Sequence, residues 1–534
     1  MKGERAGRIG VIGAGIAGLV TAKVLRDDGF DVIVFEKESA IGGVWVESRT
    51  YPGLRTNNSR DTYAFSDHPY DRSADVFPTA AQVRAYLASY VARFELGPLI
   101  RLSTEVVRVS RQGDRFAVET CDPAGLSAVV CDFVVVCAGT FSEPEVPAID
   151  GVERFDGTVV HSSQATDHAL FAGRRVVVVG AGKSALDCAA WAGSHAQACT
   201  LVFRKPHWMM PRYFPGGVPA DRLSMSRSTE AFFRYHRPSL SERLLHGPGR
   251  PLTEVVWRVV SALFRLLLRM PAAMVPDEPM PAGIENLGLS KEFYDMARRG
   301  QLILRRDSIA AFLGGPEILL ASGDQIAADV VIFATGWRQP LSFLAAELQA
   351  AVVADGRFQL YRHILPPTEP RLGFVGYASS VACQLTSEIS AHWLSQSFRG
   401  ELALPAVDEM QAEVRHVHAW LQEVMPARPQ GYQLGPYLVH HIDDLMADMG
   451  LPTRRTGNFV SEYLGRLSPA RYRELAEERQ LVQTGSLNRP PGYYISARHA
   501  LSGFAALTVA GALRRHVAAR GRVRANQHRD RNRI

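Results

Sequence analysis

Three closely spaced glycines follow a short apolar segment near the N-terminus of the chain. The apolar residues 9–12 predict a strand, and Gly13, Gly15 and Gly18 follow it with the spacing of a dinucleotide-binding turn. In such a turn the first glycine permits the tight bend, the second lets the backbone approach a pyrophosphate, and the third lets the helix pack against the strand. The pyrophosphate binds free N–H groups at the N-terminus of that helix. These residues therefore predict a dinucleotide site.

The same pattern occurs a second time further along the chain. The apolar residues 176–179 precede Gly180 and Gly182, and Ala185 occupies the third position, where the pattern accepts alanine. Ser184 lies at the expected start of the helix, where its hydroxyl is either a ligand of phosphate or a simple N-terminal cap. Two such turns in one chain indicate two bound dinucleotides, and hence redox chemistry.

The residue at the tip of the second strand differs between the two copies. Glu36 follows residues 31–35, and a carboxylate there accepts hydrogen bonds from a ribose and repels a 2′-phosphate. Arg204 follows residues 200–203, where a guanidinium binds that phosphate, and Lys205 adds a second positive charge. We therefore expect FAD or NAD at the first site and NADPH at the second. The alternatives are that one copy is a structural relic, or that Arg204 is an ordinary surface charge.

The size and composition of the chain are those of a globular protein with two or three domains. It has 534 residues, of which 46% are hydrophobic and 21% charged, and a net charge of +6. Residues 514–534 hold eight arginines and one aspartate, hence +7, which leaves −1 for the rest of the chain. A nucleic-acid-binding face needs basic residues spread over a folded domain, so we expect a disordered basic tail and no nucleic-acid partner.

The six cysteines form neither a CxxC pair nor a metal-ligand spacing. Several lie in strand-like segments, where a buried thiol serves as a small apolar side chain. We therefore expect no metal site, and a reducing, cytoplasmic location. Only a few charged residues precede the first strand, so no signal peptide is expected.

The two turns and their surroundings predict an α/β protein with two Rossmann-like dinucleotide-binding domains, the NADPH domain being inserted into the FAD domain. Residues 99–136 alternate as antiparallel strands do, and residues 330–333 are expected to close the second domain. Residues 386–399, 408–425 and 467–480 are expected to be helical. The expected domains are the first part of the FAD domain (1–165), the NADPH domain (166–335) with an apolar insertion around 207–290, the second part of the FAD domain with a helical extension (336–500), and an apolar segment with the basic tail (501–534).

Two apolar stretches outside the dinucleotide motifs allow more than one interpretation. Residues 252–270 predict a helix on which Arg258, Arg265 and Arg269 lie within about 40° of one another. This helix is a candidate for packing between domains, for weak association with a membrane surface, or for a lid over the active site. Residues 500–513 are uncharged but fall short of the roughly 20 residues that span a bilayer, so a terminal helix docked on the body is favoured over a membrane anchor.

Further motifs lie around and between the two turns. In chain order they are Gly42-Gly43-Val-Trp45, Tyr51-Pro-Gly-Leu-Arg-Thr-Asn57, Phe155-Asp-Gly157-Thr-Val-Val-His161 and Phe333-Ala-Thr335-Gly336-Trp337. Together with the turns, they resemble the single-component, NADPH-dependent flavin monooxygenases, namely the flavin-containing monooxygenases and their Baeyer–Villiger relatives. The resemblance extends from about residue 8 to about residue 450, and the linker motif that ends at His161 is its most specific part.

The resemblance implies FAD at the first turn, with Gly43 and Trp45 nearby, and NADPH at the second, with Thr335 and Gly336 on the return to the FAD domain. It further implies that NADPH reduces FAD and that O2 then forms a C4a-hydroperoxide. One oxygen atom passes to a soft nucleophile, an amine nitrogen or a sulfur, of a small organic substrate. Such a site must exclude water and position the cofactors rather than supply a strong acid or base.

Asn57 is the main catalytic candidate. The resemblance aligns it with an asparagine that faces the flavin and NADP⁺ in heteroatom-oxidising relatives, where the Baeyer–Villiger branch usually has an aspartate. The family also expects an aromatic residue four positions after His161, and here Ala165 occupies that position. In the Baeyer–Villiger branch this aromatic residue is a tryptophan followed by proline or aspartate, which Ala165-Thr166 does not supply. Both observations favour heteroatom oxidation, and oxygenation of a ketone is the alternative. The local sequence alone suggests that Asn57 caps a turn together with Asn58 and Ser59.

Two other classes of protein share part of this pattern. A flavin disulfide reductase has the same two folds but needs a redox cysteine pair, and residues 38–60 contain no cysteine. A flavoprotein without activity is disfavoured by the intact glycines and by Arg204. His161 suits a hinge between the domains better than a catalytic base. The substrate stays open, because the insertion around 207–290 that would shape its pocket matches no known pattern. The oligomeric state is open as well.

Overall fold

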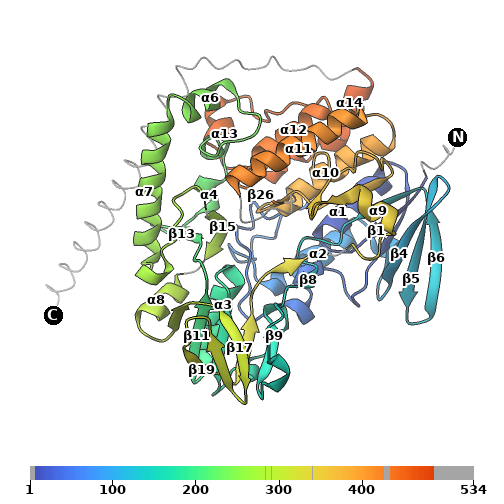
Figure 1. The fold of residues 1–534 in the computed structure, drawn as a ribbon. Helices are drawn as coiled ribbons and strands as arrows, with labels where there is room; N and C mark the ends of the chain where they lie inside the picture. The colour runs from blue at the N-terminus through green and yellow to red at the C-terminus, as the bar shows by residue number, and fades with distance from the viewer. Residues whose placement is uncertain (1–6, 283, 290, 340, 426–432, 486–534) are drawn as a thin grey trace, which may run out of the picture.

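The strands around the first glycine turn form a five-stranded parallel sheet. The computed structural model describes residues 7–282, 284–289, 291–339, 341–425 and 433–485 (Figure 1). Val11, Val34 and Val135 in this sheet are fully buried, as expected of parallel strands that are covered on both faces. The strand order is β24 (Leu372–Phe374), β7 (Phe133–Val136), β1 (Arg8–Ile12), β2 (Asp31–Phe35) and β3 (Ile100–Arg101).

A second five-stranded parallel sheet repeats this arrangement around the second glycine turn. In both sheets the strand before the glycine turn is the central one. The order is β16 (Ile303–Arg306), β11 (Ala198–Phe203), β10 (Arg175–Val179), β20 (Val330–Phe333) and β9 (Thr158–His161). The mixed α/β fold with parallel sheets is therefore confirmed.

Each parallel sheet is accompanied by a three-stranded antiparallel sheet. The two antiparallel sheets are β4 (Glu105–Gln112), β5 (Arg115–Asp122) and β6 (Gly125–Cys131), and β17 (Ile309–Gly314), β18 (Glu317–Leu320) and β19 (Gln325–Ala327). The predicted antiparallel pairing is confirmed for residues 105–131, whereas β3 and β7 at the two ends of the predicted range join the parallel sheet. The repetition seen in the two motifs thus extends over two structural units. The first unit is built around β1 and the second around β10.

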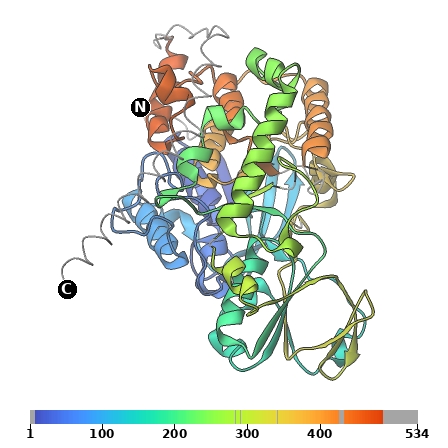
Figure 2. The same ribbon diagram turned by 90° about the vertical axis from the view of Figure 1, so that its left-hand side faces the viewer.

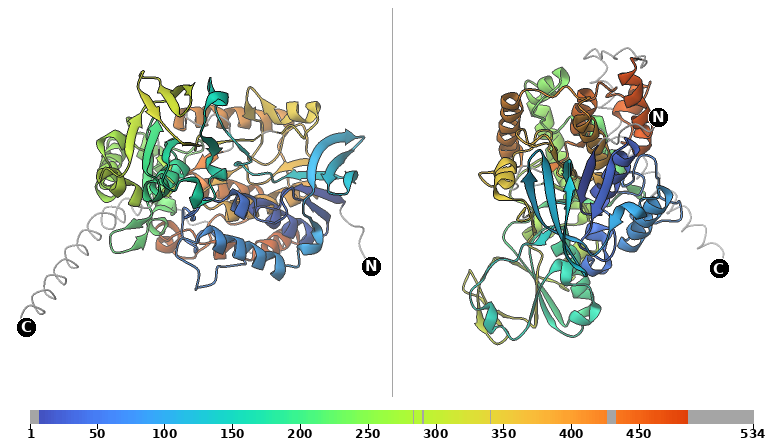
Figure 3. Two further views of the ribbon diagram at one scale, coloured as in Figure 1. Left: turned by 90° about the horizontal axis from the view of Figure 1, so that it is seen from below. Right: turned by 90° about the vertical axis from the view of Figure 1, so that its right-hand side faces the viewer.

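The chain passes between the two parallel sheets twice. It leaves the first sheet after β7, builds the second sheet and rejoins the first at β24 (Figure 3). The strand β9 precedes residue 166, so the second sheet includes residues before the start expected from the sequence. The outgoing and returning segments pair with each other as the short antiparallel strands β8 (Glu143–Pro144) and β21 (Trp337–Arg338).

Helices cover the sheets. The helix α1 (Ile16–Asp27) follows the first turn and packs against α10 (Cys383–Phe398), and α3 (Lys183–His195) follows the second turn and packs against α8 (Glu292–Arg298). The helix α2 (Ala80–Arg93) begins at Thr79, whose hydroxyl accepts a hydrogen bond from the N–H of Gln82. This N-terminal cap fixes where the helix begins, at the end of the irregular segment that contains Asn57.

The insertion consists of short helices, one long helix and paired strands. It contains α4 (Asp221–Ser224), α5 (Arg227–Glu230), α6 (Leu240–His246), α7 (Arg250–Leu268) and the paired strands β12 (Trp208–Pro211) and β15 (Ile284–Leu289). The helix α7 runs along one outer edge of the molecule (Figures 1 and 2). Among the described residues, no helix combines the length and the apolar character needed to cross a membrane.

The remaining helices are α11 (Val407–Val424), α12 (Leu438–Asp448), α13 (Phe459–Tyr463) and α14 (Leu475–Gln483). The helices predicted at 386–399 and 408–425 are confirmed as α10 and α11. The helical segment predicted at 467–480 is confirmed in part, because it is divided into a 3₁₀ turn at Pro469–Tyr472 and the helix α14. The carbonyl of Arg471 accepts hydrogen bonds from the Arg455 guanidinium instead of from a helical N–H. The apolar segment and tail at 501–534 lie outside the described residues.

Candidate cofactor and active site

The first glycine turn has no room for a side chain at its first and third glycines. Gly13 has a φ of +103°, and a β-carbon there would lie 2.7 Å from the carbonyl oxygen of Cys137. A β-carbon at Gly18 would lie 1.8 Å from the carbonyl oxygen of Gly13. The backbone of Gly15 faces that of Gly43, because a β-carbon at Gly15 would lie 3.5 Å from the Cα of Gly43. The structure therefore gathers four of the predicted cofactor residues at the N-terminus of α1.

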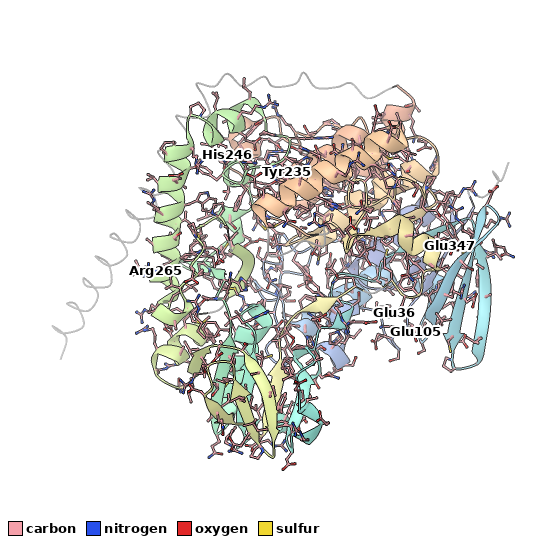
Figure 4. All side chains as sticks on the ribbon, viewed as in Figure 1. Glu36, Glu105, Tyr235, His246, Arg265 and Glu347 are labelled. Atoms are coloured by element: carbon pink, nitrogen blue, oxygen red, sulfur yellow. The ribbon has the colours of Figure 1, made fainter. Side chains whose placement is uncertain are left out.

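The carboxylate of Glu36 lies beside this turn, at the end of β2 (Figure 4). It is 5% exposed and accepts hydrogen bonds from the N–H groups of Ala14 at 2.6 Å and Glu38 at 2.9 Å. An oxygen acceptor next to a pyrophosphate-binding turn is the group that a ribose hydroxyl requires. Both of these hydrogen bonds to the buried carboxylate of Glu36 come from backbone N–H groups, and neither comes from a cationic side chain.

The indole ring of Trp45 is part of the core beneath the first turn. Its Nε1–H donates to the hydroxyl of Tyr63 at 3.1 Å, and the two rings meet edge to face with centroids 5.9 Å apart. Both side chains are buried. The structure thus shows a core contact for Trp45, and its contribution to flavin binding stays a prediction.

The second turn resembles the first in its backbone but is more open at its middle glycine. A β-carbon at Gly180 would lie 2.4 Å from the carbonyl oxygen of Ala334, whereas a β-carbon at Gly182 would have no atom within 4 Å. Ser184 lies in the first turn of α3, as predicted. The free space at Gly182 and the N-terminus of α3 together make a surface that fits a pyrophosphate.

A three-residue cluster at this turn was not predicted from the sequence. Lys183 donates to a carboxylate oxygen of Asp187 at 2.5 Å, and the hydroxyl of Tyr51 donates to the same oxygen at 3.0 Å. Burial, and then the nearby charge of Asp187, raise the pKa of Tyr51 well above its usual range, so the phenol stays protonated. Tyr51 lies in the segment between β2 and α2, so this cluster joins that segment to the second glycine turn.

Arg204 and Lys205 follow β11 on the surface of the second unit. Arg204 is exposed, and its guanidinium has no ion-pair partner among the described residues, while its carbonyl accepts a hydrogen bond from Arg306 at 3.3 Å. Lys205 is 3.3 Å from a carboxylate oxygen of Glu278. Arg204 is therefore available for an external phosphate, whereas Lys205 already has a partner.

In the loop that contains Asn57, the neighbouring residues make the local turn contacts and the Asn57 side chain does not. The side-chain amide of Asn58 donates to the hydroxyl of Thr62 at 2.8 Å, and the hydroxyl of Thr56 donates to the carbonyl of Asn58 at 2.8 Å. Asn57 is half-buried, and its side chain makes no hydrogen bond with the described residues. The turn-capping alternative thus applies to its neighbours rather than to Asn57 itself.

Asp221 of the insertion holds this loop, and sequence reasoning missed it. One oxygen of its buried carboxylate accepts hydrogen bonds from the N–H of Ser59 at 3.1 Å, from the hydroxyl of Ser59 at 2.6 Å and from the hydroxyl of Thr62 at 2.6 Å. Its other oxygen is buried and has no partner among the described residues. Because the insertion matches no known motif, no signal in the sequence pointed to this residue.

Glu388 is a second carboxylate whose environment appears only in the structure. It lies on α10, and its two oxygens accept hydrogen bonds from the N–H of Ser66 at 2.8 Å and from its hydroxyl at 2.6 Å. Burial, and then the charge of Asp67, raise the pKa of Glu388 to about 7. Glu388 therefore titrates near neutral pH in the folded protein.

Thr335 and Gly336 lie in the returning passage between the two sheets. The hydroxyl of Thr335 donates to the carbonyl of Glu145, and the carbonyl of Gly336 accepts the N–H of Glu145 at 3.0 Å. The Nε2 atom of His161 lies 3.1 Å from the same carbonyl, and burial lowers the pKa of this histidine. A neutral His161 at the end of β9 thus ties the second sheet to the returning passage, which suits a hinge, and a role of Thr335 and Gly336 in cofactor binding stays a prediction.

These features define a class of protein before any relative is considered. Two parallel sheets carry a dinucleotide turn at the end of the central strand, and the strand tips carry opposite charges, as in an oxidoreductase that uses two dinucleotides. The flavin-binding monooxygenase-like family matches residues 6–246 and 302–452. The chain belongs to this family, and the predicted resemblance is confirmed.

Individual relatives cover most of the chain. A probable flavin-containing monooxygenase 1 of Arabidopsis thaliana is 29% identical over 529 residues, which cover 89% of this chain and 97% of the relative. The structure of S-allyl-L-cysteine S-oxygenase from Allium sativum matches with a TM-score of 0.60 and 21% identity, over 93% of this chain and 97% of that one. An oxidized steroid monooxygenase bound to NADP matches with a TM-score of 0.61 and 22% identity, over 90% and 98%. Family membership supports the use of a flavin and of NADP(H).

Proposed function

We propose that this chain is an NADPH-dependent flavin monooxygenase that binds FAD at the first turn and NADPH at the second. The observation that carries the proposal is the contrast between the strand tips, a buried carboxylate at Glu36 and an exposed, unpaired guanidinium at Arg204. The former suits a free ribose and the latter a phosphorylated one. The NADPH domain is then an insertion, because the second sheet lies between β7 and β24 in the chain.

The residues of the chain would hold one cofactor at each glycine turn. Gly13, Gly15 and Gly18 leave room for the pyrophosphate of FAD, and Glu36 accepts from its ribose. Gly180, Gly182 and Ser184 would bind the pyrophosphate of NADPH, and Arg204 would bind its 2′-phosphate. When bound, the flavin supplies the redox chemistry: two electrons from NADPH reduce O2, one oxygen atom enters the substrate and the other leaves as water.

Asn57 is the proposed polar group in the active site. An amide donates and accepts hydrogen bonds without adding a charge, which suits a site that must hold a neutral, reactive oxygen donor away from water. The side chain is available for this role because Asn58 and Ser59 make the local turn contacts. The nearby Asp221 keeps the loop in place.

The proposed substrate class is a molecule with a soft nucleophile, sulfur or amine nitrogen. The asparagine at position 57, and the absence of an aromatic residue at position 165, support this choice over a ketone. Ala165 is fully buried and belongs to the same core cluster as Phe171. Oxygenation of a ketone is the second candidate, because the related structures include both an S-oxygenase and a steroid monooxygenase.

The test uses the purified full chain loaded with FAD. We expect a yellow protein that oxidises NADPH in air and converts a thioether or a tertiary amine to its oxide, with one NADPH consumed per oxide formed. A cyclic ketone offered under the same conditions should yield no ester. Exclusive ester formation would reverse the choice of substrate, and a protein that cannot bind FAD would refute the proposal as a whole.

The Asn57→Ala variant tests the role of the asparagine. It should still bind FAD and oxidise NADPH, but should release hydrogen peroxide in place of oxidised substrate. Unchanged oxygenation in this variant would remove Asn57 from the active site while leaving the cofactor assignment intact.

A further inference from the structure

The helix α7 carries a row of exposed apolar side chains. Leu252, Val255, Val259, Leu263 and Leu266 are between 40% and 73% exposed. At about 100° per residue they lie within a sector of about 80° on the helix. We call these five residues the α7 stripe. Scattered exposed apolar residues are normal, but a contiguous row along one helix indicates an interaction surface.

The opposite side of α7 is firmly packed, so the α7 stripe is preformed. Phe264 and Leu268 are buried, and Trp257 meets Phe233 edge to face with ring centroids 4.9 Å apart. Figure 2 views this side of the molecule and shows α7 in front of the other described elements. Packing on the inner face therefore fixes which side chains point outwards.

Ionic contacts also anchor the insertion that carries α7 to the C-terminal helices. Arg227 binds the carboxylates of Asp443 and Glu462, and His440 lies 2.6 Å from carboxylate oxygens of both Glu230 and Glu242. Burial alone would lower the pKa of His440, but hydrogen bonds and charge from the two glutamates raise it to about 10. His440 is thus protonated at neutral pH, and its two carboxylate partners hold α5 and α6 of the insertion against α12.

Positive charge flanks the α7 stripe. Arg258 and Arg265 are exposed and lie next to it on the helix surface, and Arg265 is on the outer edge of the molecule (Figure 4). Glu254 is the acidic residue of this helix and pairs with Arg250 at 3.0 Å and with Arg258 at 3.7 Å. The surface therefore offers an apolar row with a net positive border, which complements an anionic and apolar partner.

We propose that α7 docks onto an anionic lipid surface, with the α7 stripe in the headgroup region and its arginines on lipid phosphates. A helix of this kind lies in the plane of the interface and binds through apolar area and charge. A second copy of the chain has the same net positive border and therefore lacks the opposite charge that an anionic surface provides. The chain's own segment 500–513 is less suitable, because the sequence continues into the +7 segment 514–534. Positive charge in both regions favours an anionic membrane instead.

The position of α7 also sets this proposal apart from the family's shared features. The helix lies within residues 247–301, the internal stretch that the flavin-binding monooxygenase-like family does not match. The proposal does not depend on the redox reaction, because it rests on exposed residues of α7 and not on the glycine turns.

The experiment measures binding of the full chain to vesicles by flotation. Vesicles of equimolar phosphatidylcholine and phosphatidylglycerol are compared with phosphatidylcholine alone, at low and high salt. We expect binding to the anionic vesicles that weakens with salt. The double variant Val259→Asp, Leu263→Asp should bind at least tenfold more weakly, since apolar burial is lost and negative charge is added. Arg265→Gln should weaken binding about fivefold.

A matched control separates the α7 stripe from general surface effects. Leu126→Asp, Val130→Asp adds the same charge at two exposed apolar residues of β6, and should bind as the wild type does. Thermal melting checks that all variants are folded. Equal vesicle binding by the α7 double variant would overturn the proposal and assign binding to another segment. The proposal would also be overturned if the wild type forms a dimer that this variant abolishes, with no vesicle binding by either.

Discussion

The carboxylate of Asp221 accepts hydrogen bonds from both the backbone N–H and the hydroxyl of Ser59, at 3.1 Å and 2.6 Å. Ser59 is two residues after Asn57, whereas Asp221 belongs to the insertion, 162 positions away in the sequence. The insertion therefore contributes directly to the conformation of the loop that carries the proposed catalytic amide. Nothing else in the insertion makes a comparable set of bonds to this loop among the described residues.

Removal of this carboxylate should loosen the Asn57 loop. In Asp221→Ala the donors of Ser59 and Thr62 lose their buried acceptor, which costs about 1–3 kcal/mol of stability. We expect substrate oxygenation to fall at least tenfold while NADPH oxidation continues and hydrogen peroxide is released. Asp221→Asn should restore most of the coupling, because its amide oxygen can still accept these bonds.

The control for Asp221 is Glu242→Gln, which weakens a different anchor of the insertion at His440. This variant should melt at a lower temperature with unchanged coupling of NADPH oxidation to product. If both variants uncouple the reaction equally, the effect belongs to the insertion as a whole and not to Asp221.

Charge reversal at Arg204 should change the preference between the two nicotinamide coenzymes. In Arg204→Glu the proposed 2′-phosphate ligand becomes a repelling carboxylate, so the KM for NADPH should rise at least tenfold while that for NADH changes little. Steady-state kinetics with both coenzymes measure this. Arg174→Glu is the control, since Arg174 is exposed at the opposite end of β10 from the glycine turn. An unaltered preference in Arg204→Glu contradicts the assignment of the second site.

Glu388 should make the stability of the protein depend on pH. Its pKa rises from 4.5 to about 7 on folding, so the folded state binds more protons than the unfolded state between these values. The free energy of unfolding therefore falls as the pH rises from 4.5 to 7, and the loss is complete above 7. Glu388→Gln should be more stable than the wild type at pH 8, by up to about 3 kcal/mol, and similar to it at pH 4.

Denaturant titrations at several pH values test this prediction. Glu347→Gln serves as the control because Glu347 is an exposed glutamate on α9 (Ala346–Val352), at the surface of the first unit (Figure 4). It should leave the pH dependence unchanged. An equal gain for Glu347→Gln, or none for Glu388→Gln at pH 8, shows that another group causes the dependence.

The hydrogen bond between Tyr51 and Asp187 should help to position the second turn for NADPH. Tyr51→Phe removes one donor to Asp187 and leaves the bond from Lys183, so the loss of stability should be about 1 kcal/mol. We expect a several-fold increase in the KM for NADPH with little change in kcat for NADPH oxidation. Tyr90→Phe is the matched control, because the buried Tyr90 hydroxyl has no partner among the described residues. Equal kinetic changes in both variants argue against a specific role of Tyr51.

Local patterns were sufficient to predict both glycine turns and the charges at the two strand tips. A tight bend, a helix start and a strand end depend on a few consecutive residues, so Gly13, Glu36, Gly180 and Arg204 could be recognised without the fold. The amphipathic character of residues 252–270 was equally visible. Its periodicity could not say which face is exposed, since this depends on the aromatic side chains that pack beneath α7.

Contacts between distant residues were decided only by the tertiary structure. Asp221 and Ser59, Glu388 and Ser66, and Tyr51 and Asp187 are separated by 162, 322 and 136 positions. No local pattern states which distant backbone will approach a given carboxylate, because that approach results from the packing of whole units. The amino-acid order therefore determined the two glycine turns and the residues at the strand tips, and three-dimensional packing decided which carboxylate holds the loop of Asn57 and which face of α7 is exposed.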